Sequence, residues 1–191
     1  MNSMLSAEPQ YFSAADEPET ATIGAANYLS LTGDGPPGTD TFYAKKASLT
    51  HAATVLDAAG PVEILYWYGP EHGEIDIAGF YSTAPLDALL YRMLIRVPAD
   101  VANAGVPDEV RTATGAYGPD LGFFSMTEGK VVQVMHHGPF AGEHETLSRL
   151  GAFADAQSLR RNGPHHEIHL DPFGPGSPQE HLRTILRDPV A

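Results

Sequence analysis

Titratable side chains are concentrated in residues 165–171 (HHEIHLD), a stretch entered through a Gly-Pro pair and left through an Asp-Pro pair. Turn residues at both ends predict a short strand. Because successive side chains of a strand point to opposite faces, Glu167 and His169 share one face, while His166 and Ile168 share the other. A carboxylate on the first face is either a solvated surface charge or the polar floor of a pocket, and we expect a pocket floor.

His165, Glu167 and His169 are also three potential metal ligands on one strand face. Alternate residues of a strand lie about 7 Å apart, so their side chains converge on one ion only where the strand bends. The sequence has no H-E-x-x-H motif, and without cysteine it has no thiolate ligand. We therefore expect neither a metal nor a cofactor.

A glutamate beside a tyrosine could also do acid–base chemistry. Burial would raise the pKa of Glu167 and let its carboxyl group act as general base and acid toward an electrophilic ligand, with Tyr66 or Tyr68 as its partner. The sequence contains no G-x-S-x-G nucleophile motif and no phosphate-binding loop. An enzymatic role thus stays open, with Glu167 as the catalytic residue of a hydrolase.

The composition narrows the classes of partner. The 191 residues carry a formal net charge of −13, which opposes phosphate binding and favours cationic partners. With no helix-turn-helix pattern either, we expect no direct binding to nucleic acid. No apolar run is long enough to span a membrane, and no signal peptide is visible at the start. We expect a cytoplasmic protein that does not bind membranes, and the sequence does not fix its oligomeric state.

The first half of the chain reads as strand, helix, strand, strand. Residues 1–18 are polar, contain two prolines and predict a flexible tail. The predicted elements that follow are a strand over 21–32, a Gly-Pro loop over 33–38, a helix that begins at Thr39 and ends at Gly60, and strands over 62–68 and 89–97.

The second half repeats this order after a connector over about 99–120. A hairpin is expected around Glu128-Gly129, between strands over 123–126 and 130–136. The later predicted elements are a helix that begins near Gly142 and ends at Asn162, the strand over 165–171, and a last strand over 182–187.

The two halves also match in sequence, which indicates an internal repeat. Glu63-Ile64 after one Gly-Pro pair echoes Glu167-Ile168 after another, and residues 91–98 (YRMLIRVP) echo residues 182–189 (LRTILRDP). Two βαββ units predict one α+β domain with pseudo-two-fold symmetry, an antiparallel sheet with helices on one face, and a ligand cleft between the repeats. The predicted boundaries are a tail over 1–18 and a domain over 19–191, divided into repeat one (about 19–98), the connector (about 99–120) and repeat two (about 121–191).

Several of these segments resemble the GyrI-like small-molecule-binding domain over roughly residues 20 to 191. The closing segments carry most of the resemblance: residues 128–140 (EGKVVQVMHHGPF), His166-Glu167-Ile168, Asp171-Pro172 and residues 182–190 (LRTILRDPV), with Gly33-Asp34-Gly35-Pro36 and the Phe42 helix in the first half. The resemblance implies a stand-alone module similar to the effector-binding domain of multidrug-responsive transcription regulators. It also implies that Glu167 is the glutamate on the floor of an aromatic pocket between the repeats. His169 departs from the family, which usually has an aromatic residue there.

Aromatic residues gather in the first half, and several of them must pack in the core. As a group near a carboxylate they suit a flat, lipophilic ligand, because aromatic faces attract delocalised cations. For Glu63 the sequence leaves two locations equally open, the pocket and the surface. The expected ligand-binding residues are Glu167, Tyr66, Trp67, Tyr68, Tyr91, Phe42, Tyr28 and His169.

Three functions therefore stay open. The first is a multidrug-type binding protein for lipophilic, often cationic aromatic compounds. The second is a hydrolase that detoxifies electrophilic, cyclopropane-bearing compounds in the same pocket, an activity that the resemblance permits. The third is an acidic interaction protein that occupies a DNA-binding partner in the manner of a gyrase inhibitor. We expect them in that order.

Overall fold

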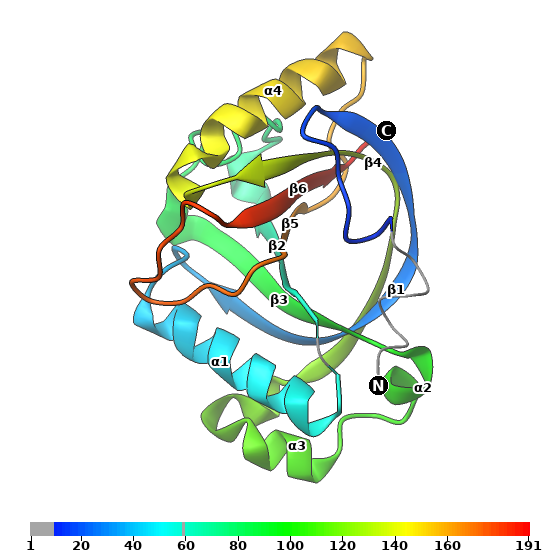
Figure 1. Cartoon of the computed structure of the whole chain (residues 1–191), viewed down its shortest axis with the longest axis vertical. Helices are drawn as coiled ribbons and strands as arrows, with labels where there is room; N and C mark the ends of the chain where they lie inside the picture. The colour runs from blue at the N-terminus through cyan, green and yellow to red at the C-terminus, as the bar shows by residue number, and fades with distance from the viewer. Residues whose placement is uncertain (1–9, 59) are drawn as a thin grey trace.

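A computed structural model describes residues 10–58 and 60–191 (Figure 1). In this part of the chain six antiparallel strands close into a barrel in the order β1-β3-β2-β5-β6-β4. The strands are β1 (Glu19–Asp34), β2 (Val62–Tyr68), β3 (Leu89–Val97), β4 (Gly122–His137), β5 (His165–His169) and β6 (Arg183–Pro189). The α+β class is confirmed, and the sheet closes on itself because β1 and β4 pair from Glu19↔Gln133 to Ser30↔Gly122.

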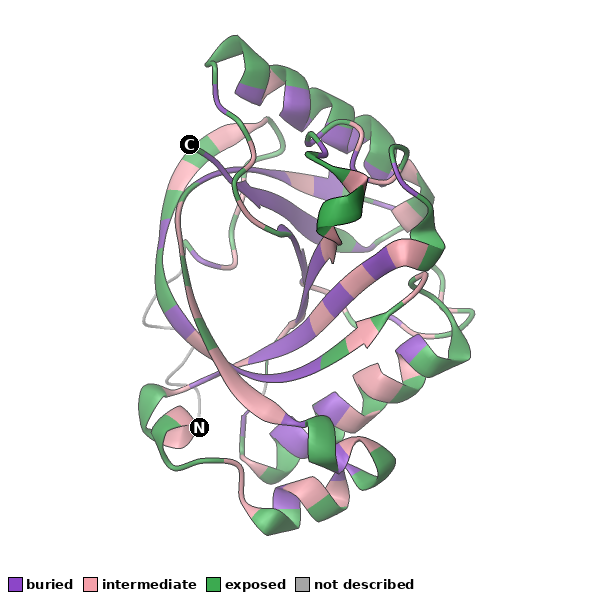
Figure 2. Cartoon of the chain, turned by 180° about the vertical axis from the view of Figure 1, so that it is seen from behind, coloured by how far each residue is buried: buried purple, intermediate pink, exposed green. Residues whose placement is uncertain are grey.

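The helices lie outside the barrel (Figure 1). They are α1 (Asp40–Val55), α2 (Ala99–Asn103), α3 (Asp108–Ala113) and α4 (Glu143–Ala156), with 3-10 turns at Pro70–His72, Leu86–Ala88, Gly115–Asp120 and Phe140–Gly142. Among the described residues, none of the helices combines the length and the apolar character needed to cross a membrane. Figure 2 shows that α4 buries the side facing the strands and exposes the other. The larger of two apolar clusters therefore lies between the helices and the outer surface of the barrel.

The strand order has the symmetry that the sequence repeat predicts. Repeat one supplies β1, α1, β2 and β3, and repeat two supplies β4, α4, β5 and β6. The corresponding strands are β1 and β4, β2 and β5, and β3 and β6. When each strand is replaced by its counterpart, the order around the barrel is the same order read in the opposite direction. The two repeats meet along the pairs β1–β4 and β2–β5. At the β2–β5 pair, the seam discussed below, Ile64 lies opposite Glu167.

The expected hairpin around Glu128-Gly129 is wrong. β4 runs unbroken through both residues and stays paired with β1 on either side of them. Gly129 has a φ of 70°, which glycine adopts without a steric cost, and the pairing register with β1 is the same on both sides of it. A glycine in the sequence favours a turn because it readily adopts positive φ. Here, however, pairing with the long strand β1 keeps the backbone of β4 extended.

The N-terminal segment is partly folded, in contrast to the tail predicted over residues 1–18. Residues 1–9 lie outside the described part of the chain. Tyr11, however, is 2% exposed and packs in the cluster that fills the barrel interior. Its ring lies 4.2 Å from the Arg96 guanidinium and 4.9 Å from that of Arg187, the matching arginines of the two repeats. The tail prediction is therefore wrong at Tyr11, because an aromatic side chain gains more by burial than its polar neighbours suggest.

A polar network surrounds Tyr11 inside the barrel. Its hydroxyl donates to Glu63 Oε2 at 2.5 Å, and its carbonyl accepts from Arg187 Nη2 at 2.7 Å. His166 lies between two carboxylates, 3.0 Å from Glu63 and 2.9 Å from Glu128. These charges are buried and paired, so each depends on the presence of its partners.

Candidate functional site

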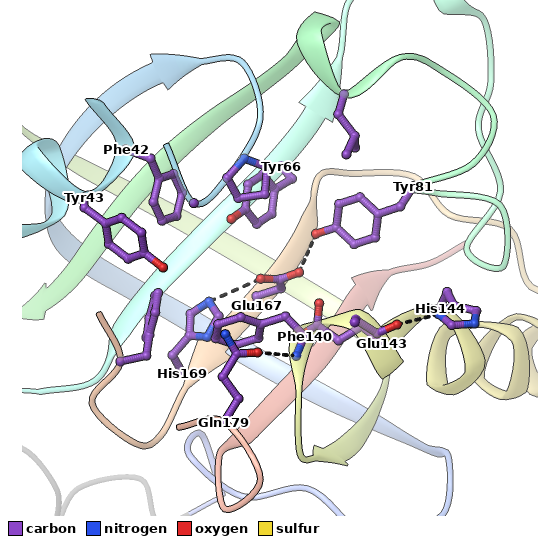
Figure 3. A pocket seen from close by; sticks show the side chains of 15 residues that line it. Phe42, Tyr43, Tyr66, Tyr81, Phe140, Glu143, His144, Glu167, His169 and Gln179 are labelled. Carbon is purple, nitrogen blue, oxygen red and sulfur yellow. Dashed lines mark hydrogen bonds and ion pairs between the residues drawn. The ribbon is translucent and has the colours of Figure 1, made fainter. Parts of the chain in front are cut away.

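A cavity of about 440 Å³ opens on the outer face of the barrel at the seam between the repeats, and Figure 3 shows its labelled side chains gathered around Glu167. The lining residues come from both repeats: the α1 N-terminus and the loop before it, β2, the β2–β3 connection, the 3-10 turn and N-terminus of α4, β5 and the β5–β6 loop. The wall residues are Pro37, Gly38, Phe42, Tyr43, Tyr66, Tyr81, Leu86, Phe140, Ala141, Glu143, His144, Glu167, His169, Phe173 and Gln179.

Glu167 reaches the cavity from β5, a strand paired on both sides. Its carboxylate accepts a hydrogen bond from the Tyr81 hydroxyl and lies 3.2 Å from His169 Nε2 and 3.6 Å from His165 Nε2. Burial opposes ionisation of this carboxyl group, but the nearby imidazoles of His165 and His169 outweigh it and lower the pKa of Glu167 well below its ordinary value. The floor of the cavity therefore carries a stable anion.

Glu143, the first residue of α4, is a second carboxyl group in the same wall. Its side chain is 5% exposed. Burial, the charge of Glu167 and a hydrogen bond between the two side chains raise the pKa of Glu143 well above its ordinary value. Two like charges in a desolvated site cannot both form, so one carboxyl group ionises and the other keeps its proton.

His165 connects the cavity floor to a further buried acid. Its Nδ1 lies 3.0 Å from Asp188 Oδ2, and both side chains are fully buried. Burial lowers the pKa of His165, but Asp188 and Glu167 raise it more, to about 9. Inside the barrel, burial is likewise outweighed at His166, where Glu128 and Glu63 raise the pKa to about 9. Both imidazoles are positively charged at neutral pH.

We expect these two histidines to make the fold less stable in alkali. A pKa raised from 6.5 to about 9 contributes stability that is complete below the unfolded value and is lost as the pH rises through the folded value. The free energy of unfolding should fall between these limits, as measured by urea denaturation. His166→Gln should flatten the profile, and the exposed His144→Gln should leave it unchanged. A wild-type profile that is flat or rises over this window would contradict the assignment.

The structure places four of the expected ligand-binding residues on the cavity wall: Glu167, Tyr66, Phe42 and His169. Tyr91 lies behind the wall, with its ring centroid 5.4 Å from that of Phe42 and 6.3 Å from that of Tyr66. It supports two of the lining rings without itself lining the cavity.

Three other expected residues lie elsewhere. Trp67 and Tyr28 pack in the cluster inside the barrel, because alternation along β2 and β1 turns them to the inner face. Tyr68 packs against Phe80 and His72 beyond the cavity. Aromatic residue type indicated a pocket for all of them, but strand register decides which face each ring occupies.

Glu63 shows the same effect of register. The Glu-Ile echo between the repeats is offset by one residue, since Glu63 is the second residue after Pro61 and Glu167 the third after Pro164. One residue of offset reverses the face of a strand side chain. Glu63 therefore points into the barrel, is 0% exposed and bonds to Tyr11, and it lies neither in the pocket nor on the surface.

Tyr81 and Glu143 are site residues that were not expected from the sequence. Tyr81 comes from the irregular segment between β2 and β3, where no periodicity fixes a side-chain direction. A signal for Glu143 does exist, because Glu143, Thr146, Leu147 and Leu150 recur at helical spacing and all are buried. A glutamate on the buried stripe of a helix is the pattern that marks this site.

Solved structures share the fold. An uncharacterized conserved protein from Listeria innocua superposes with a TM-score of 0.77 at 25% identity, over 96% of this chain and 97% of that chain. A hydrolase from Listeria innocua gives a TM-score of 0.67 at 22% identity, over 96% of each chain. The EcmrR C-terminal domain gives 0.62 at 11% identity, over 92% of this chain and 97% of that one.

No protein-family model matches the chain, and no curated protein matches it. The structural likenesses therefore establish the fold, and they are consistent with the GyrI-like fold that the sequence resembles. A shared fold does not specify a function, because one fold carries many different sites.

Proposed function

We propose that the protein binds flat, lipophilic, cationic aromatic compounds in the cavity at the repeat seam. One observation carries the proposal: a buried carboxylate, Glu167, faces a cavity whose wall contains six Phe and Tyr rings. The volume of about 440 Å³ lies within the range of small-molecule sites.

The aromatic wall favours a planar ligand. Rings enter from both repeats, with Phe42, Tyr43 and Tyr66 on one side and Phe140 and Phe173 on the other. The Phe140 and Phe173 centroids are 5.2 Å apart at an interplanar angle of 79°, so they offer both a face and an edge. Ring faces attract delocalised cations and tolerate variation in ligand shape.

The charge of Glu167 favours a cation over a neutral compound of the same shape. A desolvated carboxylate gains from a nearby positive charge far more than it would in water. The lowered pKa keeps the carboxylate ionised across the physiological range, so the attraction does not depend on pH near neutrality.

The test compares two tricycles of nearly equal size, N-methylacridinium and the neutral N-methylacridone, by isothermal titration calorimetry. We expect saturable binding of the cation at one site and at least about tenfold weaker binding of the acridone, since each factor of ten corresponds to about 1.4 kcal/mol. Equal affinities would show that the cavity does not select charge. If neither compound binds, the proposed function is wrong.

A second candidate function is hydrolysis of an electrophilic, cyclopropane-bearing compound, and the carboxyl pair favours it. Glu143 retains a proton that it can donate, while Glu167 is an anion that can accept one. In this reaction water adds to a ring carbon, the strained carbon–carbon bond breaks, Glu143 protonates the conjugated carbonyl that receives the electrons, and Glu167 takes the proton of water. The hydrolase from Listeria innocua has the same fold, although at 22% identity.

Mass spectrometry separates the two functions. Incubation with such a compound should give a product heavier by one water if the protein is a hydrolase. Both Glu143→Gln and Glu167→Gln should then lose at least about 100-fold in rate, because general acid–base groups contribute about 10²–10⁴-fold. Recovery of unchanged compound after saturable binding would favour the binding protein.

A further inference from the structure

The inference concerns the chemical class of the ligand and rests on the proposed function. We propose that the cation bound in the cavity carries N–H groups, as a protonated amine or an amidinium does, and that these groups donate to Glu143 as well as facing Glu167. The compound is thus recognised by directed hydrogen bonds at its charged end and by ring contacts elsewhere.

The first observation is an unsatisfied atom. Glu143 Oε1 is buried and has no hydrogen-bond partner among the residues that the structure describes. Buried polar atoms in proteins almost always have a partner, so an unpaired one in a cavity wall calls for a partner from the cavity contents. A protonated carboxyl group donates through its single O–H and keeps acceptor capacity on its oxygens, so Glu143 can accept a hydrogen bond from the cavity contents.

The second observation is that the neighbouring carboxylate is already partly engaged. Tyr81 donates to Glu167, and the imidazoles of His165 and His169 lie 3.6 and 3.2 Å from it. Glu167 therefore provides charge, while Glu143 provides the open acceptor. His169 Nδ1 is a further buried atom of the wall without a partner among the described residues.

A permanently alkylated cation would satisfy only part of this wall. It carries the charge that Glu167 attracts but has no N–H to donate, so Glu143 Oε1 would stay desolvated and unpaired when the cavity fills. An N–H cation meets both requirements at once, and hydrogen bonds between charged donors and carboxyl oxygens are shorter and stronger than neutral ones. The wall therefore discriminates between two cations of equal charge and similar shape.

The experiment compares aminoacridinium, which has N–H donors, with N-methylacridinium, which has none, by calorimetric titration of the wild type, Glu143→Met and Glu145→Met. Methionine keeps the length of the side chain and removes both oxygens. Glu145 is the matched control, because it is exposed and lies in the same first turn of α4. Thermal unfolding of each variant verifies that it is folded.

In the wild type we expect aminoacridinium to bind about tenfold more tightly than N-methylacridinium. Glu143→Met should bring this ratio close to one, and Glu145→Met should preserve it. Equal wild-type affinities, or a preference that persists in Glu143→Met, would overturn the inference and leave charge-selective binding intact. Failure of both cations to bind the wild type would instead overturn the proposed function itself.

Discussion

Glu167→Gln is expected to weaken the binding of N-methylacridinium by roughly 10- to 100-fold, or about 1–3 kcal/mol. Glutamine keeps the shape of the side chain and its hydrogen bond with Tyr81, but it removes the anion that faces the cavity. The loss should appear in a calorimetric or fluorescence titration. Binding of neutral N-methylacridone should stay unchanged, because ring contacts do not depend on the charge.

Glu145→Gln serves as the control for Glu167→Gln. It removes the same charge from the same protein at an exposed position, so any general effect of net charge appears in both variants. If the two variants bind the cation as tightly as the wild type, the attraction comes from elsewhere and Glu167 is not the floor of a cation site. If both lose affinity equally, the effect is a long-range field, which added salt would screen.

Arg187→Met is expected to lower the free energy of unfolding by about 3–5 kcal/mol. Arg187 is fully buried on β6 and donates to Gln133 Oε1, Glu128 Oε2 and the Tyr11 carbonyl. Methionine fills much of the same space but leaves these acceptors without a donor. A buried carboxylate that loses its partner costs more than the pair contributes when intact. Urea denaturation measures the difference.

The matched control is Arg183→Met, four residues earlier on the same strand. Arg183 forms a two-pronged pair with Asp171, at 2.8 and 3.0 Å, but its side chain is 51% exposed. Exposed pairs contribute about 0–1 kcal/mol, so this variant should unfold almost as the wild type does. Comparable losses in both variants would contradict the larger contribution to stability that we assign to the buried Arg187 network.

The sequence determined the repeat and the class of fold. Gly-Pro pairs and hydrophobic periodicity placed both long helices and the strands around them, and the matching arginine-bearing strands showed that one βαββ unit occurs twice. The seam between the repeats followed from that symmetry. Glu167 was expected to face a pocket there, because alternation along a short strand separates it from Ile168.

Only the tertiary structure decided which other residues share that seam. Trp67 and Tyr28 are aromatic, as pocket residues often are, but they lie inside the barrel because strand register turns their side chains inward. Tyr81 and Glu143 reach Glu167 from a loop and a helix end. Such contacts join residues far apart in the chain, and no local pattern specifies where an irregular segment will place its side chains.

The charge states were also decided by the fold. The sequence led us to expect that burial would raise the pKa of Glu167. The structure reverses that expectation, because two histidines of the same strand outweigh burial and lower it, while the raised pKa belongs to Glu143. A sequence gives the identity of an ionisable group, but its protonation depends on the distances to other charges, which exist only once the repeats have closed around the cavity.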